Sequence, residues 1–132
     1  MPKNIVVLVS GGGTNLQALI DAQSRGEILN GAITAVISSR PDAYALERAK
    51  AAGIPGYVVA RKDFPGNREM TQALVAKLRE LNADLVVLAG FMHILTEEMV
   101  QAYPNAILNV HPALIPSFCG KGAHGLHVHE MA

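Results

Sequence analysis

Charged side chains are few and evenly balanced in this sequence of 132 residues. Eleven Lys and Arg oppose eleven Asp and Glu, and charged residues make up only 17% of the chain. A nucleic-acid-binding surface needs clustered Lys and Arg, so we expect no nucleic-acid partner. Half of the residues are hydrophobic and 5% are aromatic, which is typical of a compact α/β protein rather than of a disordered chain.

Cysteine and long apolar runs are scarce as well. Cys119 is the one cysteine, which excludes an internal disulfide and favours a reducing compartment, the cytoplasm. No base is placed for it by sequence, so we interpret it as a small buried thiol rather than a nucleophile. The apolar run at residues 5–9 is too short for a secretion signal. No run approaches the ~20 residues of a membrane helix, so we expect no membrane partner.

Two nucleotide-binding signatures are absent around the glycine run Ser10-Gly11-Gly12-Gly13-Thr14-Asn15. The run lacks the Gly-Lys-Ser or Gly-Lys-Thr of a P-loop, and Leu16 stands where the last glycine of the dinucleotide fingerprint belongs. Glycines at the amino end of a helix nevertheless let backbone N–H groups contact an anion. A phosphate monoester, as on a ribonucleotide, fits best, and a tight strand-to-helix turn is the alternative.

Apolar runs alternate with segments of helical spacing along the chain. The expected strands are residues 5–9, 33–37, 56–59, 85–89 and 106–110. The expected helices are residues 16–25, 43–52, 67–81, capped by Asn67, and 96–102, opened by Thr96 and Glu98. This alternation predicts a doubly wound, mostly parallel α/β sheet in a single domain, residues 1–132. Residues 112–126 are expected to form an ordered loop. The chain stops within the next element, so we expect the domain to be incomplete.

Asn109 and His111 lie at the carboxyl end of the fifth expected strand and are the main candidates for catalysis. Residues two apart on a strand point to the same side, and Pro112 and Pro116 prevent further regular pairing. Open α/β sheets place their chemistry at the carboxyl ends of the strands. Histidine suits a proton carrier because its unperturbed pKa is ~6.5. The alternative is that both side chains satisfy loop backbone groups.

The sequence offers little support for a metal site or for a catalytic pair of carboxylates. His127 and His129 lie two apart near His124, but a metal site needs a further ligand and a closed shell, so we expect no metal. The acidic residues show no spacing typical of a carboxylate pair.

Three motifs together resemble the phosphoribosylglycinamide formyltransferase family. Ser-Gly-Gly-Gly-Thr-Asn-Leu begins at Ser10, Ala-Gly-Phe-Met-His-Ile-Leu begins at Ala89, and Leu-Asn-Val-His-Pro-Ala-Leu-Ile-Pro begins at Leu108. The resemblance runs from Ile5 to Glu130 and covers about the first two thirds of the family's usual length. It implies a Rossmann-like formyltransferase fold. The implied reaction transfers a formyl group from 10-formyltetrahydrofolate to the amine of glycinamide ribonucleotide in purine biosynthesis.

The same resemblance assigns roles to residues. His111 would carry the proton and Asn109 would donate a hydrogen bond to the formyl oxygen. The implied phosphate ligands are Gly12, Gly13, Thr14 and Asn15. The implied folate contacts are Arg68, Met92, His93, Ile94, Leu95 and Asn109. The family more often has arginine where His93 stands, but its contact there uses the backbone. Core packing is the alternative for Met92, Ile94 and Leu95, and a solvated helix face is the alternative for Arg68. A cis peptide before Pro116 is also implied.

The family further uses an aspartate beyond position 132 that raises the pKa of the histidine. We therefore expect formyl transfer by these residues alone to be near background, with ribonucleotide binding partly kept. Two alternatives stay open. One is another folate-dependent enzyme, a methionyl-tRNA formyltransferase or a formyltetrahydrofolate hydrolase, although these lack the triple-glycine loop. The other is a non-catalytic nucleotide-binding fragment.

Overall fold

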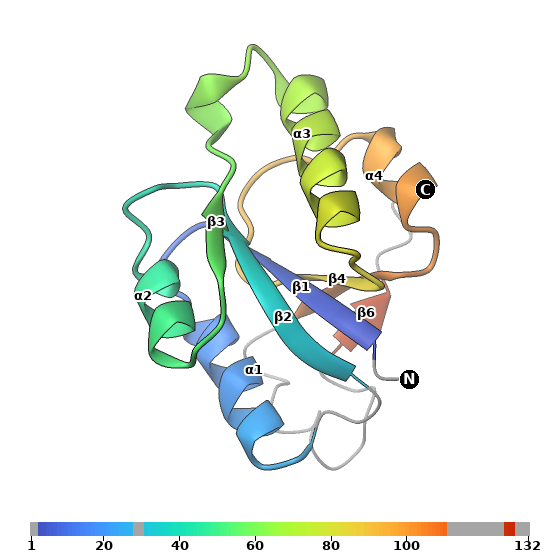
Figure 1. Ribbon diagram of the computed structural model, residues 1–132. Helices are drawn as coiled ribbons and strands as arrows, with labels where there is room; N and C mark the ends of the chain where they lie inside the picture. The colour runs from blue at the N-terminus through green and yellow to red at the C-terminus, as the bar shows by residue number, and fades with distance from the viewer. Residues whose placement is uncertain (1–2, 28–30, 111–125, 129–132) are drawn as a thin grey trace.

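The computed structural model describes residues 3–27 and 31–110 and the backbone of 126–128, and its centre is a six-stranded sheet (Figure 1). The strands lie in the order β3-β2-β1-β4-β5-β6. They are β1 (Lys3–Val9), β2 (Gly31–Ser38), β3 (Gly56–Val58), β4 (Leu85–Leu88), β5 (Ile107–Val110) and β6 (Leu126–Val128). The pairings among β1 to β5 are parallel, and β6 runs antiparallel to β5. The mostly parallel sheet expected from the sequence is confirmed.

Helices cover both faces of the sheet. They are α1 (Thr14–Ser24), α2 (Tyr44–Ala51), α3 (Asn67–Glu80) and α4 (Glu97–Ala102), with a 3₁₀ turn at Arg61–Asp63. Figure 1 shows α1 and α2 on one face and α3 and α4 on the other. This is the doubly wound arrangement that the alternation of runs predicts. None of the helices in the described part of the chain is long and apolar enough to cross a membrane.

The two helical layers enclose two hydrophobic cores that share the central strand. Leu16 and Leu19 of α1 pack with Val7 in one core, and Met70 and Leu74 of α3 pack with Val6 in the other. Successive residues of a strand point to opposite faces, so the part of β1 that both helical layers cover, residues 5–9, must be apolar at every position. This requirement explains why these five residues form a continuous apolar run rather than an alternating one.

The second strand contains an irregularity that its apolar run does not reveal. Ile5 of β1 pairs with Ile33, but Val6 pairs with Ala35, so Thr34 is an extra residue in β2. Because of this bulge, Ile33 packs in the α1/α2 core while Ala35 packs in the α3/α4 core. Without the extra residue the two side chains would share a face. The bulge therefore places the two apolar side chains in different cores.

Helix ends follow the expectations in part. Asn67 was expected to cap α3, and this is wrong: Gly66 is the cap, and Asn67 Oδ1 accepts a hydrogen bond of 3.0 Å from Arg61 Nε. Thr96 does cap α4, and its hydroxyl donates to the Glu98 carboxylate. The Asn67 prediction failed because the guanidinium from the preceding 3₁₀ turn competes for the same side-chain oxygen.

The strand order fixes where the loops meet. The chain leaves β1 toward α1 on one face, and it leaves the neighbouring β4 toward α4 on the other face. Such a topological switch point leaves a crevice beyond the carboxyl ends of the strands. The glycine run, residues 89–95 and Asn109 all lie at this edge, as the sequence predicts.

Candidate functional site

A hollow of about 520 Å³ opens at the switch point. It is lined by residues 10–15, by Ala89, Gly90, Met92 and His93 after β4, and by Arg40 after β2. Gly13 precedes α1 with a φ of +81°, in the left-handed region that glycine adopts without strain. The hollow therefore lies at the amino end of an 11-residue helix, where backbone N–H groups and the helix dipole favour an anion.

The second helix fixes the shape of the glycine loop. Ala45 N donates to Gly11 O at 3.2 Å, and Arg48 Nε donates to Gly12 O at 2.8 Å. A Cβ on Gly13 would lie 2.7 Å from Ala45 Cβ, whereas one on Gly11 or Gly12 would have no atom within 4 Å. Packing against α2 therefore requires the third glycine. The first two leave the backbone open, so they are the positions where an anion can approach it.

A chain of hydrogen bonds ties the carboxyl ends of β1, β2 and β4 together. Ser39 Oγ donates to Ser10 Oγ at 2.9 Å, and Ser10 Oγ also accepts from Met92 N at 2.9 Å. His93 Nε2 lies 3.0 Å from Ser39 Oγ. Because the one hydroxyl proton of Ser39 goes to Ser10, Nε2 of His93 is the donor in the last bond. The network thereby holds the loop after β4 against the glycine loop.

The surroundings of His93 disfavour its charged form. Partial burial, with a smaller contribution from the Arg61 charge, lowers the pKa of His93 below its ordinary value. The ring also makes an edge-to-face contact with Phe91, with centroids 5.4 Å apart. Sequence reasoning selected His93 as a backbone contact, and the structure adds a side-chain role in the network. Sequence reasoning missed Ser39, although its position just after the second apolar run was a usable signal.

The other expected folate contacts after β4 separate into two groups. Met92 lines the hollow and is 82% exposed, and Ile94 is 69% exposed. Leu95 is buried in the α3/α4 core. The alternative of core packing therefore holds for Leu95, while Met92 and Ile94 offer an apolar surface at the edge of the site.

Asn109 is half-buried near the end of β5, where it pairs with Leu88 of β4. On the opposite side of β5 its register partner is His127 of β6. Asn15 reaches toward the same edge from α1, because its Nδ2 would lie 3.7 Å from a Cβ on Gly90. His111 lies outside the described residues, as do Cys119, His124, His129 and the Ile115-Pro116 peptide.

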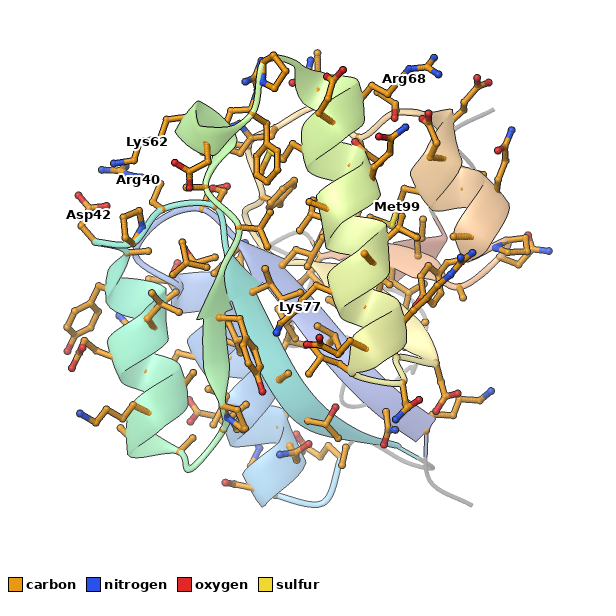
Figure 2. The ribbon with its side chains drawn as sticks, turned by 45° about the horizontal axis from the view of Figure 1, so that its top comes forward. Arg40, Asp42, Lys62, Arg68, Lys77 and Met99 are labelled. Carbon is orange, nitrogen blue, oxygen red and sulfur yellow. The ribbon has the colours of Figure 1, made fainter. Side chains whose placement is uncertain are left out.

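Arg68 does not line the hollow. It lies in the first turn of α3, where its guanidinium pairs with Glu98 at 3.0 Å and Glu97 at 4.0 Å. Figure 2 shows Arg68 at the top of the view near the amino end of α3, well apart from Arg40 at the left edge. A hydrogen bond from Thr96, with a smaller contribution from Arg68, lowers the pKa of Glu98. The role of Arg68 as a folate contact stays a prediction.

Metal ligation has no candidate in the described part of the chain, where no three His, Cys, Asp or Glu side chains gather. The histidines proposed as alternatives, at 124, 127 and 129, fall outside this finding, since no side chain is described for them.

Comparison with known proteins shows the family to which this chain is similar. Residues 3–132 match the family model described as formyl transferase. The phosphoribosylglycinamide formyltransferase of Haemophilus influenzae is 50% identical over 92% of this chain and 57% of its own length. The enzyme of the same name from Escherichia coli is 42% identical over 98% of this chain and 58% of its own. The chain thus spans less than two thirds of the length of these relatives.

Solved structures of proteins with the same or an equivalent name share the fold of this chain. Glycinamide ribonucleotide transformylase 1 from Symbiobacterium toebii has a TM-score of 0.79 and 44% identity, over 89% of this chain and 55% of that one. The phosphoribosylglycinamide formyltransferase of Coxiella burnetii, in complex with CHES, has a TM-score of 0.79 and 39% identity, over 98% of this chain and 66% of that one. A family match over nearly the whole chain and the fold shared with these solved structures lead to one conclusion: the chain belongs to the formyl transferase family.

Proposed function

We propose that the hollow at the switch point binds the phosphate of glycinamide ribonucleotide, and that the adjoining ends of β4 and β5 carry formyl transfer from 10-formyltetrahydrofolate. The observation that carries the proposal is the open backbone of Gly11 and Gly12 at the amino end of α1. The names of the relatives support the choice of substrate. A reducing compartment such as the cytosol fits this proposal.

Phosphate binding follows from the glycine loop. The first turn of a helix leaves backbone N–H groups without partners inside the helix, the residues that begin α1 line the hollow, and the helix dipole adds a partial positive charge there. Thr14 and Asn15 lie in this first turn and line the hollow, so a hydroxyl and an amide are available as further donors. A phosphate monoester has enough acceptor oxygens to use all of these groups.

Formyl transfer needs groups at the end of β5. The substrate amine attacks the formyl carbon, a tetrahedral intermediate forms, and it collapses to formylated product and tetrahydrofolate. The Asn109 amide would stabilise the developing oxyanion, and His111 would move the proton from the attacking nitrogen to the leaving one. The exposed side chains of Met92 and Ile94 suit the flat apolar part of a folate.

Binding is the first test of this proposal. We expect calorimetric titration with glycinamide ribonucleotide to give a saturable isotherm, and a second titration with a folate analogue to follow. Gly12→Val should weaken the first isotherm, because a β-branched side chain would stand over the open backbone. Ala76→Val, on the exposed side of α3, is the control. Absence of ribonucleotide binding to the unmodified chain would refute the proposed substrate, and binding of the ribonucleotide alone would indicate a half-site.

Turnover is the second test. Release of tetrahydrofolate should be measured at saturating substrates for the unmodified chain, Asn109→Ala and His111→Ala. Loss of one oxyanion donor or of the proton carrier typically slows such reactions by ~10²-fold or more. Turnover by the unmodified chain that stands above background and is unchanged in both variants would contradict the roles proposed for Asn109 and His111.

A further inference from the structure

The hollow beside the glycine loop is lined by one residue with a permanent charge. Among its described lining residues, Arg40 is the single Lys, Arg, Asp or Glu, and the remainder are small, polar or apolar apart from His93, whose pKa is lowered by burial. A phosphate monoester carries nearly two negative charges at pH 7. The helix dipole supplies only about half a positive charge, so a full cation at this place would add most of the neutralisation.

The backbone of Arg40 is held firmly at the carboxyl end of β2. Ser38 Oγ donates to Arg40 O at 2.7 Å and accepts from Arg40 N at 3.0 Å. Ser38 is fully buried, so this clamp is anchored in the sheet. The arginine side chain therefore starts from a fixed point beside the glycine loop, and only its own rotamers decide where the guanidinium lies.

The guanidinium is engaged by a neighbour that can be displaced. Nε and Nη2 of Arg40 donate to the two carboxylate oxygens of Asp42, both at 3.2 Å. The two side chains are 60% and 69% exposed, and exposed ion pairs are weak. Figure 2 shows both side chains at the outer edge of the molecule beside Lys62. A phosphate, with a larger charge than a carboxylate, would compete well for the same fork of donors.

A second hollow, of about 670 Å³, lies on the other side of Arg40 and is lined by Asp42, Arg61 and Lys62 among others. Arg61 is committed to Asn67 Oδ1 at 3.0 Å and to Phe64 O at 2.9 Å. Cations outnumber acidic residues in this lining, so its potential favours anions. Lys62 lines this second hollow and is absent from the lining of the first. It therefore offers a charge-matched comparison for Arg40.

We propose that Arg40 is the cationic ligand of the substrate phosphate and that Asp42 competes with the phosphate for it. In the free protein the Arg40 guanidinium is paired with Asp42, and in the complex it turns to the phosphate at the amino end of α1. This inference rests on the proposed function, because it takes the phosphate to bind in the glycine-loop hollow. It adds a specific cation and a built-in competitor to that site.

The test compares two ligands on four proteins. Glycinamide ribonucleotide and its dephosphorylated nucleoside are titrated into the unmodified chain, Arg40→Gln, Lys62→Gln and Asp42→Asn. We expect Arg40→Gln to weaken ribonucleotide binding by about twofold to fivefold, the range of a solvent-exposed charge pair. Asp42→Asn should tighten it by about twofold to fivefold. Lys62→Gln should leave it unchanged, and no variant should alter binding of the nucleoside.

The outcomes separate this inference from the proposed function. Failure of the ribonucleotide to bind the unmodified chain would refute the proposed function, and this inference would fail with it. Equal ribonucleotide affinity in the unmodified chain and Arg40→Gln would overturn the role of Arg40 alone. Equal losses in Arg40→Gln and Lys62→Gln would also overturn it, since a diffuse field would then explain the effect. Thermal unfolding of each variant confirms that the exposed substitutions leave the fold intact.

Discussion

The hydroxyl of Ser39 donates a hydrogen bond of 2.9 Å to the hydroxyl of Ser10, and both residues are buried. Ser10 follows β1 and Ser39 follows β2, so this bond joins two neighbouring strand ends at the edge where the site lies. Ser10 also accepts from the backbone after β4. A pair of small side chains thus sets the spacing between the two loops that line the hollow.

Removing the Ser39 hydroxyl should destabilise the protein. In Ser39→Ala, Ser10 loses a donor and His93 Nε2 loses its acceptor, so we expect the free energy of unfolding to fall by about 1–3 kcal/mol. Urea unfolding measures this change. Ser24→Ala, at the exposed end of α1, is the matched control and should be nearly neutral. Equal effects of the two substitutions would show that the network contributes nothing to stability.

The same chemical change should act differently at two neighbouring glycines. Gly13→Ala places a Cβ 2.7 Å from Ala45 Cβ and 2.8 Å from Ala45 Cα at a φ of +81°. We expect it to cost about 2 kcal/mol or more of stability, from strain and a forced shift of α2. Gly12→Ala meets no atom within 4 Å and should stay within about 0.5 kcal/mol. Denaturant unfolding of both variants is the measurement, and similar losses in both would be inconsistent with this packing.

Arg48 should shape the site without entering it. Its guanidinium donates to Gly12 O at 2.8 Å and to Gln17 Oε1 at 3.3 Å, and it stacks over Tyr44. Arg48→Gln should loosen the glycine loop and weaken ribonucleotide binding by about threefold to tenfold. Arg48→Lys should not restore it, because an ammonium cannot reproduce the planar fork.

The comparison for Arg48 is Lys50→Gln, which removes the same charge from an exposed position of α2. We expect this variant to bind the ribonucleotide as the unmodified chain does. A full rescue by Arg48→Lys, or an equal loss in Lys50→Gln, would assign the effect to charge rather than to geometry.

The pH dependence of stability should carry a contribution from His93. Burial first, and Arg61 second, lower its pKa in the folded protein, so the unfolded chain binds more protons as the pH falls. The contribution is fully present above the unfolded pKa of about 6.5 and is lost as the pH falls below it. Unfolding midpoints of the unmodified chain and His93→Gln should therefore converge as the pH falls below about 6.5. A constant difference would contradict the shifted pKa.

Fold prediction from this sequence succeeds where local patterns are sufficient. Apolar runs such as residues 85–88 predict buried strands because both faces of the sheet are covered. Positive-φ glycines at 26 and 53 end α1 and α2 close to the expected positions. The prediction that Asn67 caps α3 was wrong, because Arg61 donates a hydrogen bond to its side-chain oxygen and this contact is visible only in the tertiary structure.

The placement of the candidate site residues divides in the same way. The sequence by itself determined that the glycine run, the residues after β4 and Asn109 meet at one edge, because parallel strands end on the same side. Only the tertiary structure decided that Gly13 packs on Ala45, that Ser39 reaches Ser10 from 29 positions away, that Arg40 borders the hollow and that Arg68 does not. These contacts depend on which strands become neighbours and on how helices pack over them. Local periodicity carries no information about distances between segments that are far apart in the chain.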